Sequence, residues 1–313
     1  MATGPTLVFL YRASRKAWGS TTMRSEQLAK LVTPHLQDMQ VQVQVLSRHE
    51  ILQNLWAHFV HKGATIFATK DVVKVLSPSA VHVLHARGCR VCLDVVDMRR
   101  EDLPGPELGA DCFISPSLNG LSVLKDYVQQ KFPLSGHRPL VMPVLHNADS
   151  RLYGKHLRPS HEAKIAYWGA MKNVLITPAI ANQIDLIDGS DSGSFQRSLD
   201  LILDYNVHYA IRPDATEQRI KPFTKGVNAA VLGALVLADR GVQDAAEMLG
   251  DDYPFLLDDT EEATVLTGIA RMKGAFGGSD WRLAQERVTH MANQVSPAAL
   301  ADQLRAMIKA VGG

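Results

Sequence analysis

The chain has 313 residues, of which 46% are hydrophobic and 21% are charged, and its formal net charge is +1. This composition is typical of a globular protein with room for two domains. The balanced charge excludes the basic footprint of a nucleic-acid-binding protein. The longest run without charged or strongly polar residues, 229–238, is about half of the roughly 20 residues that a membrane-spanning helix needs.

The three cysteines do not make a disulfide framework and suit a reducing compartment. The first apolar stretch has no basic residue before it, so it predicts a strand rather than a signal peptide. We therefore expect a cytoplasmic protein. Residues 1–150 hold 16 Lys and Arg against 12 Asp and Glu, and this mild excess leaves room for peripheral contact with a membrane surface.

The first half of the chain alternates short β-rich runs with segments of helical period. This alternation predicts a parallel sheet with helices on both faces. We expect strands at 6–11, 41–46, 64–68, 90–96, 111–115 and 139–143, and helices at 23–36, 49–60, 71–86 and 117–132.

A polar stretch without a clear period, 147–163, predicts a linker, and a second alternation follows it. We expect strands at 164–169, 183–188, 206–213, 235–239 and 253–257, and helices at 194–205, 224–234, 242–250, 260–274, 279–293 and 297–311. The fold class is therefore α/β, with two doubly wound Rossmann-like domains, 1–150 and 151–313, and closing helices. Such sheets bind ligands outside the carboxyl ends of their strands, so we expect a site in a cleft between the domains.

Two lysines bracket the start of a predicted helix in the sequence IKPFTKG, residues 220–226. The preceding strand ends at Arg212, Pro222 suits a first helical turn, and Thr224 can cap the helix. Free N–H groups, a helix dipole and the cations Lys221 and Lys225 make an anion site, for which a diphosphate is the obvious ligand. The alternative is that the lysines are solvated charges at a helix start.

Two further residues follow a strand in the second half. Gly169 allows close approach of a phosphate to the backbone, and Lys172 adds positive charge, although an ordinary strand-to-helix turn explains both equally well. The sequence has no GxGxxG after a strand and no GxxxxGK[ST], which disfavours a dehydrogenase or a P-loop ATPase.

The order AYWG, a strand ending in Arg, KPFTK and GALVLAD resembles the C-terminal domain of GT-B fold glycosyltransferases. The resemblance implies a nucleoside diphosphate sugar as donor and a hydroxyl acceptor on a glycan, lipid-linked molecule, protein or small molecule. It implies no further cofactor. The large retaining family of this fold carries an E-x7-E pair near this helix, whereas residues 226–238 contain no Glu. This departure disfavours membership of that family.

Candidate residues of the first half follow its strands. The basic segment 12–29 between the first strand and helix offers Arg15, Gly19, Ser20 and Arg24 to the acceptor or to donor phosphates. An inverting transferase needs a general base, for which we choose Asp97, with His146 as the rival. The alternative for Asp97 is a helix cap or a partner of a neighbouring arginine.

Several weaker signals suggest metal binding, and we expect no metal site from them. Cys89 and Cys92 lie in a predicted strand, which sends them to opposite faces. The pairs His58/His61 and His82/His85 lack a carboxylate in a known pattern, and the DGSD at 188–191 follows a strand as a turn.

The sequence therefore predicts a metal-independent glycosyltransferase that stabilises a leaving diphosphate with cations and a helix N-terminus. Two alternatives stay open. A sugar-nucleotide 2-epimerase shares the architecture, but it needs several carboxylates and a His around the sugar. A non-catalytic nucleotide-sugar sensor or scaffold would keep the phosphate site without a base.

Overall fold

The computed structural model describes residues 4–13, 19–47, 49–50, 54–133, 136–189, 192–213, 220–242 and 244–312. The chain divides into two compact units. Unit 1 comprises Met1–Ser150, Gln218–Pro222 and Pro297–Gly313, and unit 2 comprises Arg151–Glu217 and Phe223–Ser296. Unit 1 thus includes two segments from beyond residue 150, whereas the division expected from the sequence is continuous.

Unit 1 contains a six-stranded sheet in the order β2-β1-β3-β4-β5-β6, and every pair of neighbouring strands is parallel. Five of the strands lie within one residue of their expected bounds at both ends, and β4 ends two residues early. The strands are β1 (Thr6–Arg12), β2 (Gln40–Leu46), β3 (Thr65–Ala68), β4 (Arg90–Asp94), β5 (Cys112–Ser115) and β6 (Leu140–Pro143).

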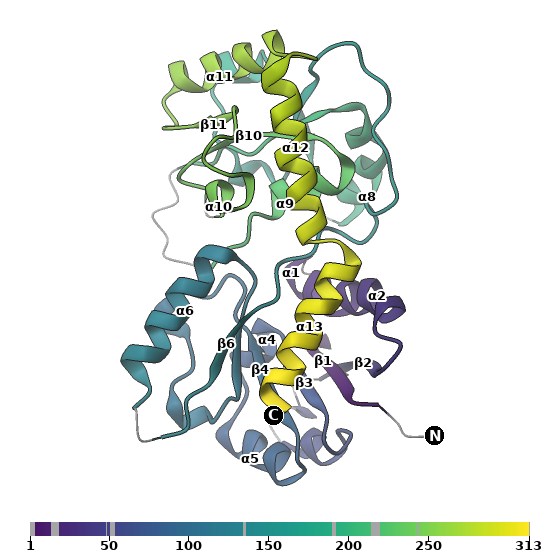
Figure 1. The fold of residues 1–313 in the computed structure, drawn as a ribbon, viewed down its shortest axis with the longest axis vertical. Coiled ribbons are helices and arrows are strands. Elements are labelled where there is room, and N and C mark those ends of the chain that lie inside the picture. The colour runs from purple at the N-terminus through teal and green to yellow at the C-terminus, as the bar shows by residue number, and fades with distance from the viewer. Residues whose placement is uncertain are drawn as a thin grey trace. The chain divides into compact units, whose positions relative to one another are not determined.

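Helices cover both faces of this sheet, as the near-continuous apolar run of β1 requires. Val8 and Leu10 of β1 share a buried cluster with residues of α5 and α6, whereas Phe9 contacts Phe67 with ring centroids 4.9 Å apart. Figure 1 shows α13, in yellow, beside β6, and α13 also packs against α2. The helices and helical turns are α1 (Gly19–Thr22), η2 (Met23–Gln27), α2 (Leu28–Val32), η3 (Thr33–His35), η4 (Leu55–His58), α4 (Lys70–Val73), α5 (Pro78–Ala86), η5 (Arg100–Asp102), η6 (Pro106–Leu108), α6 (Leu118–Lys131) and α13 (Pro297–Gly312).

The single helix expected at 71–86 is wrong, because the structure has two. Pro78 cannot donate a backbone hydrogen bond to a preceding turn, so it starts a new helix instead. Ser77 caps α5 by accepting a hydrogen bond of 3.2 Å from the N–H of Ala80. The helix expected at 49–60 is also shorter in its described part, where only the 3₁₀ turn η4 and residues 49–50 are helical.

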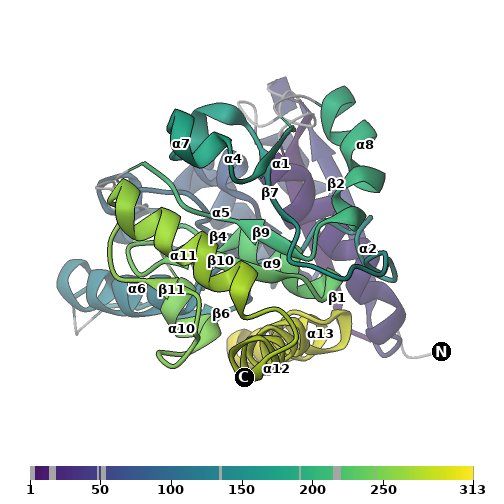
Figure 2. The same cartoon turned by 90° about the horizontal axis from the view of Figure 1, so that it is seen from above.

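Unit 2 contains a five-stranded parallel sheet in the order β11-β10-β9-β7-β8. Figure 2 shows α7, α8, α11 and α12 around these strands. The strands are β7 (Ile165–Gly169), β8 (Asp185–Asp188), β9 (Val207–Tyr209), β10 (Leu235–Asp239) and β11 (Leu256–Leu257). The helices and helical turns are η7 (Met171–Asn173), α7 (Pro178–Ala181), α8 (Ser192–Leu201), η8 (Ile202–Asp204), α9 (Thr224–Leu232), α10 (Ala245–Leu249), α11 (Glu262–Gly274) and α12 (Ser279–Gln294).

Both faces of the second sheet are buried as well. Ala166 and Trp168 of β7 pack with Leu199 of α8 and Leu232 of α9. On the other face, Gly268 of α11 lies so close to β10 and β11 that an added Cβ would stand 2.7 Å from Leu257. The predicted α/β class with two doubly wound parallel sheets and C-terminal helices is therefore confirmed. In the described part of the chain, no helix is long and apolar enough to cross a membrane.

Candidate functional site

The second sheet changes winding direction between β7 and β9, because the chain goes from β7 to β8 on one side and then returns to β9 on the other. Ligands of doubly wound sheets bind at the carboxyl ends of strands at such a switch point. The residues at those ends are Gly169 of β7 and the segment from Ala210 to Arg212 after β9. Gly169 and Arg212 are both candidates from the sequence.

Lys225 lies at this edge, in the first turn of α9. Its Nζ donates a hydrogen bond of 2.8 Å to the carbonyl oxygen of Trp168. The same ammonium lies 3.9 Å from the ring centroid of Tyr167, in a cation–π contact. Both contacts fix the position of the charge next to the end of β7.

Gly169 is a glycine for two physical reasons. Its φ of 147° is in a region that favours glycine, and an added Cβ would stand 2.7 Å from the Nζ of Lys225. The close approach of the ammonium to the backbone therefore needs a residue without a side chain. Lys172 follows in η7 and is exposed.

Two cations, Lys225 and Arg212, interact electrostatically at this site. Burial lowers the pKa of Lys225 to about 7, and the neighbouring positive charge of Arg212 adds to the shift. The positive charge of Lys225 in turn lowers the pKa of His208, which is already low because the imidazole is buried. Like charges held together at a sheet edge are unfavourable in the unliganded protein, and an anion would relieve their repulsion.

Helix α9 begins at Thr224, and its first intrahelical hydrogen bond runs from the N–H of Val227 to the oxygen of Phe223, at 3.0 Å. The N–H groups of residues 224–226 precede that bond and have no intrahelical acceptor. Thr224 is the first helical residue and Phe223 occupies the N-cap without a side-chain hydrogen bond, so the prediction that Thr224 caps the helix is wrong.

The two lysines of IKPFTKG belong to different units. Ile220 pairs with the first unit through its N–H to Met98 oxygen, at 2.9 Å, and its oxygen accepts from the N–H of Asp97, at 2.7 Å. Pro222 therefore precedes the helix instead of forming its first turn. Lys221 acts electrostatically on Asp97 within unit 1, whereas Lys225 belongs to the cluster in unit 2.

Asp97 lies after β4, at the carboxyl edge of the first sheet, with a left-handed φ of 55°. Its Oδ2 is 2.8 Å from the Nζ of Lys70, and the two side chains are 30% and 20% exposed. Burial raises the pKa of Asp97, but Lys70, His146 and Lys221 more than offset this, and the pKa lies below its ordinary value. The carboxylate is therefore ionised at neutral pH and reachable from solvent.

His146 follows β6 at the same edge, but it is buried. Its Nδ1 lies 2.8 Å from the oxygen of Asn147, which makes Nδ1 the protonated nitrogen in the neutral ring. Burial and the charge of Arg24 lower the pKa of His146 to about 3. The imidazole is only 3% exposed, whereas the carboxylate of Asp97 is 30% exposed, so accessibility to an acceptor hydroxyl favours Asp97 over His146 as the general base.

Arg24 is not a loop residue, and the prediction that it binds the acceptor or donor phosphates from a loop is wrong. It lies in η2 with 0% exposure and forms an ion pair of 3.0 Å with Asp94, which is equally buried. Its other donors reach the carbonyl oxygens of Val144 and Leu145, both at 2.9 Å. A buried guanidinium needs acceptors for all its donors. Because its acceptors lie in β4 and in the segment after β6, the Arg24 side chain joins η2 to both.

Two of the remaining candidates lie at the start of α1, where Gly19 is exposed and Ser20 is half-buried. Their role in ligand binding stays a prediction. Arg15 lies outside the described residues.

The metal signals of the sequence do not assemble into a cluster among the described residues, where no group of three or more His, Cys, Asp or Glu side chains is placed to hold a metal ion. The Sγ of Cys89 donates to the oxygen of His61 at 3.3 Å, and Cys92 lies opposite Cys112 in the sheet. His85 pairs with Asp111 at 2.8 Å.

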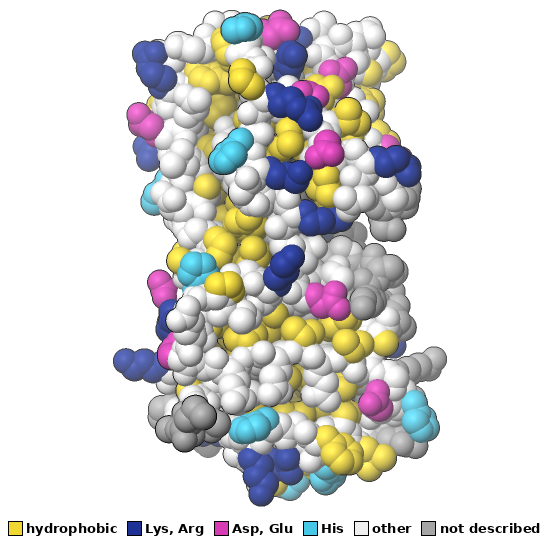
Figure 3. Space-filling model, turned by 90° about the vertical axis from the view of Figure 1, so that its right-hand side faces the viewer, with side chains coloured by type: hydrophobic (Ala, Val, Ile, Leu, Met, Phe, Trp, Pro, Cys, Tyr) yellow, Lys and Arg dark blue, Asp and Glu magenta, His cyan; other side chains and the backbone are white. Residues whose placement is uncertain are grey.

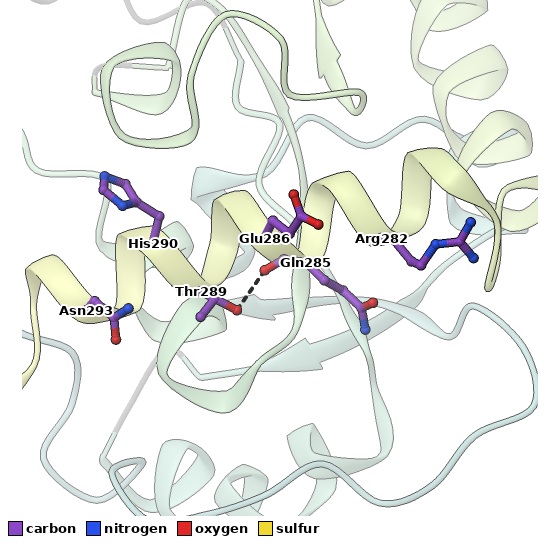
Figure 4. A pocket seen from close by; sticks show the side chains of 6 residues that line it. All are labelled: Arg282, Gln285, Glu286, Thr289, His290 and Asn293. Atoms are coloured by element: carbon purple, nitrogen blue, oxygen red, sulfur yellow. Dashed lines mark hydrogen bonds between the residues drawn. The ribbon is translucent and has the colours of Figure 1, made fainter.

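Three hollows lined by described residues lie away from these edges. Figure 4 shows the first, a hollow of about 480 Å³ whose six lining side chains all come from α12, and Thr289 in it bonds to Gln285 at 2.7 Å. The second, of about 720 Å³, lies at the amino ends of β7 and β8. The third, of about 450 Å³, is lined by residues of α6 and by residues 138–141. None of the three hollows contains a candidate from the sequence.

Lys70 and Tyr167 contact candidate residues but are not among the residues predicted from the sequence. Lys70 comes two residues after the buried strand β3. This position at the carboxyl end of a strand is the sequence feature that could have identified it as a site residue. Tyr167 reads as a core residue of β7, and no local pattern shows that a lysine 58 positions later lies over its ring.

Two doubly wound parallel sheets, with closing C-terminal helices, define a GT-B-like α/β fold, the fold of nucleotide-sugar glycosyltransferases. The sequence matches no protein-family model, and no curated protein matches it in sequence.

Several solved structures of GT-B glycosyltransferases are similar to this chain over nearly its full length. A glycosyltransferase from Rickettsia africae ESF-5 has a TM-score of 0.66 at 10% identity and covers 98% of both chains. Anabaena Alr3699/HepE in complex with UDP has a TM-score of 0.63 at 12% identity, with 97% of this chain and 100% of that chain covered. The E. coli trehalose-6-phosphate protein bound with UDP-2-fluoro glucose has a TM-score of 0.59 at 8% identity, with 98% and 99% covered.

Proposed function

We propose that this protein is a metal-independent glycosyltransferase that moves a sugar from a nucleoside diphosphate donor to a hydroxyl acceptor. The observation that carries the proposal is the cluster of Lys225, Arg212 and Gly169 at the switch point of the second sheet, beside the start of α9. Two cations and free helical N–H groups suit a diphosphate, whose negative charge grows as the sugar leaves.

Each unit contributes one part of the chemistry. Unit 2 binds the donor, and its cations stabilise the diphosphate as the bond between the anomeric carbon and the phosphate oxygen breaks. Unit 1 binds the acceptor, and Asp97 takes the proton of the acceptor hydroxyl as its oxygen bonds to the anomeric carbon. Lys221, next to Asp97, adds positive charge on this side.

The donor base is best sought first among uridine nucleotides, because two of the similar structures contain UDP or a UDP-sugar. The melting temperature of the protein, measured with UDP, GDP, ADP, dTDP and CMP in turn, identifies the preferred base, since a ligand that binds the native state raises the melting temperature of the protein. No shift with any of these nucleotides at millimolar concentration would refute the proposed donor site.

Removing one cation tests the site itself. Charge-assisted hydrogen bonds contribute about 1.5–3 kcal/mol, so Arg212→Ala is expected to weaken binding of the shifting nucleotide about 10- to 150-fold. The control Lys273→Ala removes an exposed cation at the amino ends of β7 and β8 and is expected to leave the affinity unchanged. Tight binding with no sugar transfer to any acceptor, and no hydrolysis of the donor, would instead identify a nucleotide-sugar sensor.

A further inference from the structure

The two sheets have four edge strands, β2, β6, β8 and β11. An open edge presents unpaired backbone groups, and proteins usually protect it by shortness, charge, proline or a covering element. Three of these edges are protected: β11 has two residues, β8 carries Asp185 and Asp188, and β6 ends in Pro143 beside α13. By contrast, β2 has seven residues, QVQVQVL, with no charge and no proline.

The outward backbone groups of β2 can be identified from the register. The N–H of Gln40 donates to the oxygen of Pro5, at 2.9 Å, so the even-numbered residues of β2 face β1. Because successive backbone groups alternate in direction, those of Val41, Val43 and Val45 point away from the sheet. Within the described part of the chain, no hydrogen bond reaches these groups from the outer side.

The side chains of this edge are also exposed. Val43 and Val45 are 41% and 43% exposed. Figure 3 shows the side on which β2 lies in Figure 1, and in its lower half hydrophobic side chains are exposed at the surface, with acidic, basic and histidine side chains around them. Leu140 of β6 and Leu186 of β8 are exposed as well, but only β2 combines exposed apolar side chains with a long edge that lacks charge and proline.

The sequence of β2 is complementary to the same strand of a second copy of the chain. In an antiparallel pair centred on Val43, each Val43 faces its counterpart, Val41 faces Val45, and Gln42 faces Gln44. A shift by one residue would place valine opposite glutamine throughout. A self-complementary patch is what a two-fold dimer interface requires, and valine pairs and glutamine pairs stabilise neighbouring strands.

We propose that β2 pairs in antiparallel orientation with β2 of a second copy of this chain, which joins two six-stranded sheets across a two-fold axis. The outward N–H and C=O groups of the three valines then form the hydrogen-bonded positions of the new ladder. This interface is separate from the candidate site, and it does not depend on the proposed function.

Sedimentation equilibrium of the full chain tests the pairing. The wild type is expected to dimerise in the micromolar range. Val43→Lys places two ammonium groups opposite each other on the axis, which is expected to raise the dissociation constant about 100-fold or more. The matched control is Leu186→Lys on β8, an edge residue that is 43% exposed, and it should leave the dimer unchanged.

Cross-linking gives a readout that does not depend on a disruptive charge. The described cysteines, Cys89, Cys92 and Cys112, are buried, so a short bis-maleimide reacts mainly at an introduced thiol. Val43→Cys should cross-link into a dimer, and Leu186→Cys should not. A wild type that is monomeric up to high micromolar concentration overturns the proposal, as does a dimer that a folded Val43→Lys variant retains.

Discussion

At the scale of single residues, Lys225 combines a functional position with an unfavourable environment. Burial lowers its pKa to about 7 from an ordinary 10.5, with Arg212 adding to the shift. Between these values the unfolded chain binds more protons than the folded chain, so stability rises with pH over that window. The folded protein therefore carries this charge at a cost in free energy, which a bound anion would reduce.

Replacement of this lysine should stabilise the empty protein. Lys225→Met keeps the length of the side chain and removes the buried charge, so its melting temperature is expected to exceed that of the wild type at pH 6–7. The difference should shrink toward pH 9, where the wild-type amine is neutral. Calorimetry at several pH values measures this, and a variant that is less stable than the wild type at pH 6 would contradict it.

The same group makes nucleotide binding depend on pH. The affinity for the nucleotide is expected to fall from pH 7 to 9 as Lys225 loses its proton. The phosphate groups do not cause this fall, because their second pKa is near 6 and they no longer titrate in this range. Calorimetric titration with UDP checks the slope. In Lys225→Met the affinity should be low and nearly independent of pH, whereas an unchanged slope would assign the dependence to another group.

Lys70 makes the largest contribution to keeping Asp97 ionised. Replacing it by Met removes the ion pair of 2.8 Å and leaves burial to raise the pKa of Asp97. The acid limb of the pH profile of kcat/KM is therefore expected to move to higher pH in Lys70→Met and to return toward the wild type in Lys70→Arg. Asp97→Asn should abolish transfer at every pH while nucleotide binding persists.

At the scale of elements, the buried pair of Arg24 and Asp94 joins η2 to β4, and its further hydrogen bonds reach the segment after β6. Loss of one partner leaves an uncompensated buried charge, which typically costs about 3–5 kcal/mol. Arg24→Met is expected to lower the free energy of unfolding by about that amount. The double variant Arg24→Met/Asp94→Leu should recover much of the loss, as chemical denaturation will show.

At the scale of the whole molecule, the last two helices belong to different units. The oxygen of Val311 in α13 accepts from Arg90 at 2.8 Å, and Gln303 accepts from the N–H of Leu145 at 2.8 Å, both within unit 1. Helix α12 instead packs against α9 and α10 in unit 2. The chain therefore returns to its first unit in its final 17 residues, Pro297–Gly313.

Cavity-forming substitutions should reveal this division. Leu304→Ala in α13 and Val288→Ala in α12 both remove buried apolar groups, at a cost of a few kcal/mol or less. Hydrogen exchange is expected to rise in α2 and β6 for the first variant and in α9 and α10 for the second. Equal increases in both units for both variants would contradict the division.

The sequence by itself determined the class of fold, because short apolar runs can be buried on both faces only in a parallel sheet covered by helices. It also selected Arg212, Gly169 and Lys225, since each follows a strand or opens a helix in the chain. It failed where the outcome depends on distant parts of the chain. Arg24 looked like a loop cation, but tertiary contacts supply its buried partner 70 residues away.

Only the tertiary structure decided which neighbours each candidate has. Lys221 and Lys225 are four positions apart, yet the structure assigns them to different units, because Ile220 pairs with the strand end at Asp97. The pKa of Lys225 and of Asp97 likewise depends on Arg212 and Lys70, which no local spacing connects to them. Sequence patterns report burial along one element, whereas charge and ligand geometry arise where several elements end together.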